Sequence, residues 1–503
     1  MSPEAHDQED LRVPAWWIAG LTLVALALRL AGLDGGLWID EIYSLLGSFR
    51  PPLAQIVTEF PGDNQHPLYS VLAHVSLTLF GESAWSVRLP AVLFGVASVP
   101  LLYALGARVA SRREGLLAAA LLTVSYHHIW FSQNARGYSA LAFFAMLATL
   151  LLLRGLERRS AGPYLGYAIA ASLGAYTHLT MVFVVIGHAA VIGIRNIRRD
   201  PPGRRWRDGA GPWIGFALAG IITLLWYAPI LTRVQQFFLH HPSGLKGVST
   251  PSWAAQEAIR GLMQGLGAGT GVLAAAVVVA AALLFGVGLA SYARSAPLAL
   301  GLFVAPGVVT IFGAVGGRGT IYPRFYLALI GCGILIGVRG AMVAADRIAT
   351  RWSARDARRM GDALGTAVVA TMIVLSAASL GFNYRYPKQD FDGARQWLET
   401  SRGAEDRIVT VGATTMPYHD WMRLPWPSAK SAKELGELRR GVQRTWVVYT
   451  LPRYLEYSAP DLMRMIRQDC PTSRVFPGTL GGGDIVVCTL APVAASASAN
   501  EPR

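Results

Sequence analysis

The sequence predicts an all-α polytopic membrane bundle of about eleven transmembrane helices, followed by a small C-terminal α/β domain. The first observation is composition: 53% of the 503 residues are hydrophobic and 15% are charged, whereas soluble domains carry about 25% charged residues. The second is patterning, because apolar runs long enough to cross a bilayer recur up to residue 382 and then stop. We therefore expect a transmembrane domain over 1–382, an extracytoplasmic α/β domain over 383–490 and a disordered tail over 491–503.

The individual spans follow from the need for about 20 mostly apolar residues per transmembrane helix. The first run has no small-residue cleavage site after it, so we expect an uncleaved anchor rather than a signal peptide. A segment over 66–80 is too short to cross, and we expect it to lie along the outer surface within a large outer loop over 34–88. The expected spans are 13–33, 89–107, 115–131, 138–154, 163–178, 180–194, 212–231, 271–291, 297–315, 325–345 and 363–381.

The positive charge of the chain lies in particular loops. The formal net charge is +14, and arginines concentrate in short connections near 108–113, 154–159, 195–207 and 347–359. Such loops are cytoplasmic by the positive-inside rule. This places the N-terminus in the cytoplasm and the C-terminal domain outside an inner, or plasma, membrane. The distribution argues against a nucleic-acid partner, which would require a basic patch on one folded surface.

The C-terminal region combines helix and strand signals. Phe391 to Arg402 has a helical pattern, and the short apolar runs 407–412, 445–450 and 484–489 indicate buried strands. Cys470 and Cys488 both fall here, and whether they pair stays open at the level of sequence, because pairing depends on geometry.

Two adjacent acids, Asp40 and Glu41, stand directly after the first span in LWIDEIYS. Carboxylates at the point where a membrane helix meets a loop are costly to desolvate, so they indicate chemistry or ion handling near the bilayer surface. Two simpler interpretations remain: both acids are solvated loop residues, or Asp40 caps a helix that begins at Glu41.

Other outer loops carry arginines and tyrosines. Arg88 closes the first loop, and Arg136 and Tyr138 follow the third span; a later loop holds Arg318, Tyr322, Arg324 and Tyr326. Arginine binds phosphate bidentately and stays charged, and a carboxylate accepts a proton from an acceptor hydroxyl or amine. Convergence of these loops would therefore suit a phosphorylated, lipid-linked substrate.

The order of motifs along the chain resembles a known family. The sequence runs LWIDE, QHPLYSVLAH, LFGESAWSVRLPAVLFG, HIWFSQNARGYSAL and YPRFYLAL, and DFDGARQWLE follows the last span. This order is similar to that of the family-39, GT-C-type membrane glycosyltransferases, which include protein O-mannosyltransferases and lipid A aminoarabinose transferases. The resemblance implies a GT-C-like bundle that uses a polyprenyl-phosphate-linked sugar as donor on the outer face of the membrane.

The resemblance also implies roles for individual residues. Asp40 matches the family's catalytic base and Glu41 its neighbouring acid. His66 stands where the family often has Lys, in a donor-phosphate position, and a neutral His is a weaker phosphate partner than Lys. Arg136 and Arg324 would bind the phosphate of the donor. The remaining candidates, for substrate binding, are Tyr138, Tyr326 and Arg88.

The implied reaction is a single displacement at the anomeric carbon, with inversion and with a lipid, glycan or protein as acceptor. Asp40 and Glu41 leave a divalent metal open, and no other cofactor is expected. A lipid or sugar transporter or flippase is the main alternative, and a non-catalytic scaffold is a third.

Simpler interpretations are expected for several polar residues near or within the spans. His127 and His128 would be interfacial anchors, His178 and His188 satisfied histidines of the bundle, and Arg29 would snorkel to the outer surface.

Overall fold

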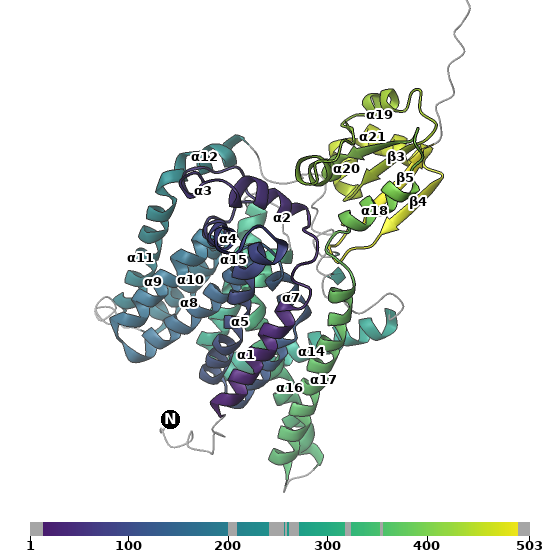
Figure 1. Cartoon of the computed structure of the whole chain (residues 1–503). Helices are drawn as coiled ribbons and strands as arrows, with labels where there is room; N and C mark the ends of the chain where they lie inside the picture. Colours follow the sequence, from purple (N-terminus) through teal and green to yellow (C-terminus); the bar gives the residue numbers. More distant parts are fainter. Residues whose placement is uncertain are drawn as a thin grey trace, which may run out of the picture. The chain divides into compact units, whose positions relative to one another are not determined.

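The computed structural model describes residues 14–199, 209–240, 256, 259–260, 271–316, 323–352 and 356–490. Two compact units are present within these residues (Figure 1). The helical unit holds 14–34 and the described residues of 48–240 and 254–384. The α/β unit holds Gly35–Gly47 together with 385–490.

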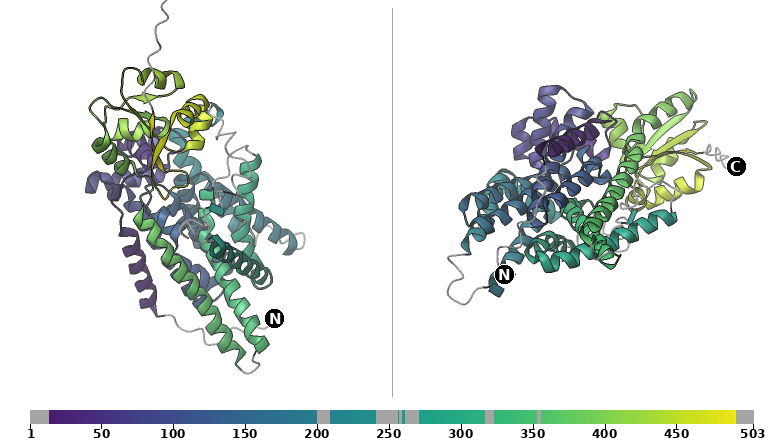
Figure 2. Two further views of the ribbon diagram at one scale, coloured as in Figure 1. Left: turned by 90° about the vertical axis from the view of Figure 1, so that its right-hand side faces the viewer. Right: turned by 90° about the horizontal axis from the view of Figure 1, so that it is seen from below.

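The helical unit consists of helices and short connections (Figures 1 and 2). Two 3-10 helices, η3 (Ala228–Ile230) and η4 (Pro323–Leu329), precede α12 and α16, and a π-helical turn, η2 (Leu45–Phe49), follows α2 in the chain. The helices are α1 (Ala15–Leu30), α3 (Leu53–Thr58), α4 (Pro67–Phe80), α5 (Ala84–Val109), α6 (Arg112–Thr123), α7 (Tyr126–Ser132), α8 (Tyr138–Arg158), α9 (Ala161–Thr177), α10 (Met181–Arg199), α11 (Ala210–Tyr227), α12 (Leu231–His240), α14 (Gly271–Ser295), α15 (Pro297–Gly316), α16 (Ile330–Trp352) and α17 (Ala357–Arg385).

Each predicted span coincides with helical structure. Among the described residues, seven helices are long and apolar enough to cross a membrane: Ala84–Val109, Tyr138–Arg158, Met181–Arg198, Ala210–Phe237, Ala275–Ser295, Arg324–Trp352 and Ala357–Arg385. Three shorter apolar helices, Ala15–Leu30, Pro67–Phe80 and Pro297–Gly313, accompany them. The chain is thus a polytopic membrane protein, while the number of eleven crossings stays a prediction.

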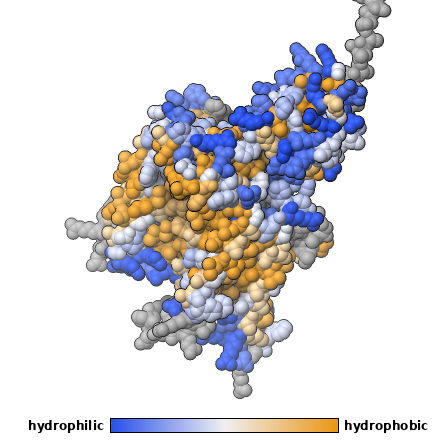
Figure 3. Space-filling view, in the orientation of Figure 1, coloured by the Kyte–Doolittle hydropathy of each residue, from blue (hydrophilic) through white to orange (hydrophobic). Residues whose placement is uncertain are grey.

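The outer surface of the bundle is apolar, as a lipid-facing surface requires. Leu225, Leu283 and Phe312 are 68%, 67% and 73% exposed. Figure 3 shows apolar residues over much of the side of the helical unit that faces the viewer. Water would penalise such exposure, whereas lipid tails do not, so these residues mark the membrane-embedded belt.

Among the seven candidate spans, α8 is the most enclosed, with α5 and α9 packed against it. Leu141 and Met146 of α8 are fully buried. Small residues let neighbouring helices approach closely: a Cβ at Gly106 of α5 would lie 2.6 Å from the Cα of Gly115 in α6. A rigid α8 matters for function because its first residue, Tyr138, lies in the candidate site described below.

The predicted third span is broken, and the break explains the position of Arg29. α6 ends at Thr123 and α7 begins at Tyr126, so the last carbonyls of α6 lack helical partners. The guanidinium of Arg29 donates to the carbonyls of Thr123 (3.3 Å) and Leu122 (3.4 Å). Arg29 is fully buried, and the prediction that it snorkels to the surface is wrong. His128, 2.8 Å from Arg29, is also fully buried, so it is not an exposed interfacial anchor.

The α/β unit is built around one mixed sheet with the strand order β2-β1-β3-β5-β4. β1 (Arg407–Val411) pairs in parallel with β2 (Ser428–Ala429) and β3 (Thr445–Tyr449). β5 (Ile485–Leu490) is antiparallel to β3 and to β4 (Thr472–Phe476). Its helices are α2 (Ile39–Ser44), α18 (Phe391–Ser401), α19 (Ala432–Leu438), α20 (Pro452–Ser458) and α21 (Pro460–Asp469), with the turns η5 (Gly412–Thr414) and η6 (Pro417–Trp421).

The structure confirms the predicted helix at 391 and the three predicted strands, and adds β2 and β4. Cys470 and Cys488 form a disulfide, which resolves the pairing that the sequence left open. The predicted tail over 491–503 lies outside the described residues. One boundary differs from the prediction: Gly35–Gly47, expected to belong with the outer loop of the membrane domain, clusters with the α/β unit.

Candidate active site

The acid pair lies on the short helix α2 of the α/β unit. The helix begins at Ile39, so Asp40 falls within its first turn and is not its N-cap, which is Trp38. The interpretation of Asp40 as the cap of a helix starting at Glu41 is therefore wrong. Glu41 is fully buried, and its Oε2 accepts the backbone N–H of Trp38 at 3.3 Å. Glu41 thus closes the first turn and fixes the backbone that carries Asp40.

A second group of predicted residues gathers in the helical unit, and we call it the arginine–histidine cluster: His66, Arg136, His178 and Arg324. The four residues come from the loop before α4, the turn before α8, the turn between α9 and α10, and η4. The imidazole rings of His66 and His178 lie 4.8 Å apart, and Phe325, next to Arg324, lies 5.7 Å from His178. The structure thus brings together the three predicted donor-phosphate residues and adds His178.

Hydrogen bonds define which nitrogen of each imidazole carries the hydrogen. Nδ1 of His66 accepts the backbone N–H of Gly137 at 3.2 Å. Nδ1 of His178 accepts the N–H of Thr180 at 3.2 Å and its hydroxyl at 2.8 Å. A neutral imidazole with an accepting Nδ1 has its hydrogen on Nε2. Both histidines therefore offer an Nε2–H donor, which an anion can accept without any change of protonation.

The electrostatics keep both histidines neutral. Burial lowers the pKa of His66 well below its usual value, and the positive charges of Arg136 and Arg324 lower it further. Burial, with Arg136 and Arg324, lowers the pKa of His178 to about 3. Both shifts have the sign expected for cationic neighbours. They also show that the two guanidinium groups act on the same two imidazoles, so the cluster is a region of positive potential.

The backbone around Gly137 holds the cluster together. Arg136 donates to the carbonyl of Asn64 at 2.7 Å and to its side-chain oxygen, which fixes the loop that leads to His66. A Cβ at Gly137 would lie 2.7 Å from Nδ1 of His66 and 2.6 Å from Thr177, so only glycine fits here. Sequence analysis missed this glycine; the signal was its place between Arg136 and Tyr138.

Tyr138 forms one wall of the cluster. Its ring centroid lies 5.3 Å from that of His66 and 5.4 Å from that of His178, and the guanidinium carbon of Arg136 lies 5.7 Å from the same ring. The side chain is only 2% exposed. Tyr138 thus orients the cluster, in addition to any contact with a substrate.

The other predicted residues occupy different places. Arg88, which is 3% exposed, donates to the carbonyl of Leu33 at 2.8 Å and so ties α5 to the end of α1. Tyr326 lies on η4, two residues beyond Arg324, and is partly buried. Arg318 and Tyr322 lie outside the described residues.

The direction of the helices relates the cluster to the arginine-rich loops. α8 begins at Tyr138 and ends near Arg158, and α10 begins after His178 and ends at Arg199. α16 follows η4 and ends near Arg351. The cluster therefore lies at the opposite ends of these helices from the predicted cytoplasmic loops.

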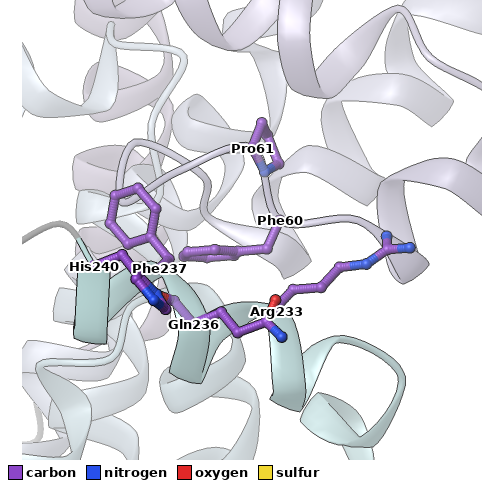
Figure 4. Close-up of a pocket in the computed structure, with 6 residues that line it drawn as sticks. All are labelled: Phe60, Pro61, Arg233, Gln236, Phe237 and His240. Carbon is purple, nitrogen blue, oxygen red and sulfur yellow. The ribbon is translucent and has the colours of Figure 1, made fainter.

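A separate hollow lies between the loop after α3 and helix α12 (Figure 4). It has a volume of about 450 Å³, and the rings of Phe60 and Phe237 meet edge to face there at 5.5 Å. None of the predicted site residues lines it, and its lining contains no carboxylate. This hollow is therefore not the candidate active site. Its lining residues are Phe60, Pro61, Arg233, Gln236, Phe237 and His240.

A metal site at Asp40 and Glu41 would need at least one further ligand. Within the described ranges, no three His, Cys, Asp or Glu side chains gather as a metal site would require. The binding of a divalent cation by Asp40 and Glu41 stays a hypothesis from the sequence.

Comparison with known proteins gives matches in sequence family and in structure. A model of the family described as dolichyl-phosphate-mannose-protein mannosyltransferase matches residues 64–227. No curated protein matches the chain in sequence. ArnT from Cupriavidus metallidurans in the apo state is similar in structure, with a TM-score of 0.55 at 15% identity over 94% of this chain and 98% of that one.

The chain has the GT-C fold. The structure of the same ArnT bound to undecaprenyl phosphate gives a TM-score of 0.53 at 15% identity, covering 97% of this chain and 100% of that one. The oligosaccharyltransferase of Archaeoglobus fulgidus with Zn and sulfate gives 0.51 at 12% identity, over 93% and 72% of the two chains. The GT-C resemblance predicted from the motifs is confirmed, and placement within family 39 stays a prediction.

Proposed function

We propose that this GT-C protein is an integral membrane glycosyltransferase that moves a sugar from a polyprenyl-phosphate donor to a lipid, glycan or protein acceptor. The observation that carries the proposal is the arginine–histidine cluster, in which two guanidinium groups and two Nε2–H donors lie close together. A phosphate is the anion that such a set of donors suits, because it accepts several charge-assisted hydrogen bonds at once. The match to ArnT, which was solved with undecaprenyl phosphate, supports the same substrate class.

In the proposed reaction the two sites divide the chemistry. Asp40 accepts the proton of the acceptor nucleophile, which attacks the anomeric carbon and displaces the polyprenyl phosphate. The cluster stabilises the negative charge that develops on the departing phosphate. Because a phosphate leaves readily, no strong general acid is needed. A single displacement inverts the anomeric carbon, whose transition state has oxocarbenium character.

We propose further that the active site and the α/β unit face the extracytoplasmic side of the inner membrane. Three helices that begin beside the cluster end at arginine-rich loops, which the positive-inside rule assigns to the cytoplasm. The Cys470–Cys488 disulfide supports this orientation for the α/β unit, because disulfides persist in oxidising compartments. A transporter or flippase is not favoured, since the matched fold is that of GT-C proteins.

Transfer assays on the purified full-length protein in nanodiscs test this function. Polyprenyl-phosphate-linked sugars extracted from membranes serve as donors. Mass spectrometry detects a sugar added to each member of a panel of glycolipid and glycoprotein acceptors. We expect a product whose anomeric configuration is inverted and whose formation is lost in Asp40→Asn. Absence of both transfer and polyprenyl-phosphate binding in the wild type would refute the proposal.

A further inference from the structure

A chain of hydrogen bonds links the acid-bearing helix α2 to the sheet of the α/β unit. The N–H of Ile39, the first residue of α2, donates to Oε1 of Gln389 at 3.0 Å. The amide nitrogen of Gln389 donates to Oγ1 of Thr450 at 3.1 Å, and the hydroxyl of Thr450 donates to the carbonyl of Gly483 at 3.1 Å. Gln389 and Thr450 are each 1% exposed.

Gln389 supplies what the start of α2 lacks. The first N–H groups of a helix have no intrahelical acceptor, and Trp38 provides no side-chain cap. Gln389 therefore acts as a cap that comes from a distant part of the chain. Because Ile39 immediately precedes Asp40, this hydrogen bond fixes the backbone next to the proposed base.

The segment that carries Gln389 is itself held in place. The carbonyls of Pro387 and Lys388 accept the N–H groups of Thr479 (2.8 Å) and Leu480 (3.1 Å). A Cβ at Gly478 would lie 2.4 Å from the carbonyl oxygen of Lys388, so the close approach requires glycine. The backbone before Gln389 is thus held by residues 479 and 480, while its side-chain amide contacts Ile39 of α2 at one end and Thr450 at the other.

The contacts of α2 lie at the carboxyl ends of two neighbouring parallel strands, β1 and β3. Thr450 directly follows β3, and η6, which contacts α2, follows the neighbouring parallel strand β1. The chain leaves β1 toward β2 on one side and leaves β3 toward β4 and β5 on the other. Crevices at such switch points, outside the carboxyl ends of parallel strands, commonly hold ligands. Here the chain's own acid-bearing helix contacts η6, beyond β1, and is linked through Gln389 to Thr450, beyond β3.

We infer that Gln389 is a positioning residue for Asp40, and that the α/β unit serves the reaction by holding α2 through Gln389 and Thr450. The inference rests on the proposed function, because it takes Asp40 as the base. It requires no contact of Gln389 with substrate. Misplacement of a catalytic group by about 1 Å can lower turnover about 100-fold, so the loss of one such hydrogen bond is measurable.

The test uses the full-length protein and two readouts, transfer kinetics and affinity for undecaprenyl phosphate. Gln389→Met keeps the length of the side chain and removes both hydrogen bonds. We expect kcat to fall about 10- to 100-fold, with the donor KM and undecaprenyl phosphate affinity unchanged, because the cluster is untouched. Gln389→Glu retains an acceptor for the N–H of Ile39 and should recover most of kcat. Gln396→Met, at an exposed position of α18, is the matched control and should behave as wild type.

Several outcomes separate the inference from the proposed function. If Asp40→Asn is inactive while Gln389→Met and Thr450→Val both turn over like the control, the positioning role is overturned and the function stands. If Asp40→Asn retains full turnover, the assignment of the base fails whatever Gln389 does. Should Gln389→Met not fold, Thr450→Val decides, because it removes the acceptor of the Gln389 amide: lowered kcat at unchanged KM supports the inference and unchanged kcat overturns it.

Discussion

The proposed donor-phosphate site can be tested most directly through Arg324. Its guanidinium lowers the pKa of both imidazoles of the cluster, and it lies on the 3-10 helix η4, directly before α16. Arg136 is a less clean target because it also holds the Asn64 carbonyl, so its loss would displace the loop before His66. Arg324→Ala therefore removes charge from the site and leaves the hydrogen bonds between Arg136 and Asn64 in place.

The expected magnitude follows from one charge-assisted contact in a partly buried site. Such a contact contributes about 1.5–3 kcal/mol, so Arg324→Ala should weaken binding of undecaprenyl phosphate about 10- to 150-fold. The neighbouring histidines cannot compensate at neutral pH, because burial and Arg136 still hold their pKa values below the usual range. Arg324→Lys keeps the charge but not the bidentate geometry, and should give an intermediate loss.

The assay is equilibrium binding of undecaprenyl phosphate to the purified protein in nanodiscs. Arg50→Ala serves as control, since Arg50 forms an exposed ion pair with Glu82 at 2.7 Å, away from the cluster residues in sequence, and should not affect binding. The thermal unfolding midpoint of each variant establishes that the fold is intact. Equal affinity in wild type, Arg50→Ala and Arg324→Ala would show that the cluster is not the phosphate site.

Three further predictions address the base, the glycine and the histidines. Asp40→Asn should lower kcat about 10²- to 10⁴-fold with unchanged undecaprenyl phosphate affinity and thermal midpoint; near-normal turnover would move the base elsewhere. Gly137→Ala should destabilise the protein by about 1–3 kcal/mol and weaken donor binding, since its Cβ displaces His66, and an unchanged thermal midpoint would contradict the close contact. Stability should fall as pH drops from about 6.5 toward 3, by about 1.4 kcal/mol per pH unit for each buried neutral histidine, because the unfolded chain binds protons that His66 and His178 do not. His178→Gln should make that fall shallower in thermal unfolding measured across pH, and an unaltered slope would contradict the lowered pKa.

Sequence patterns predicted the helical bundle well because the bilayer imposes the length of each apolar span. The same reasoning failed at Arg29, since hydropathy does not reveal that the third span breaks at Thr123 and leaves carbonyls to be satisfied. β2 has only two residues and β4 is largely exposed, so neither has the apolar run that identified the other strands.

Individual residues of the candidate site could be predicted only where they belong to one of the family-like sequence motifs. His178 was taken as a satisfied histidine, and its Nδ1 is indeed satisfied by Thr180, but its ring lies beside His66 because α9 and α10 turn at that point. Nothing in the local sequence of Gln389 indicates a role, since its partner Ile39 is 350 residues away in the chain. Long-range contacts of this kind depend on the tertiary fold.

The hydrogen bond from Gly137 to His66 has a consequence for the source of the positive potential. Gly137 is the residue at the N-terminal end of α8, where the aligned peptide dipoles of the helix leave a partial positive charge. Its N–H polarises the imidazole of His66, which presents Nε2–H on its other side, so the ring passes the helix dipole on to whatever anion lies beyond it. The N–H of Thr180, just before α10, does the same through His178. In the proposed function, part of the attraction for phosphate therefore comes from the main chain at the starts of α8 and α10. An amine at position 66 would interrupt this relay, because an ammonium group has no lone pair with which to accept the N–H of Gly137.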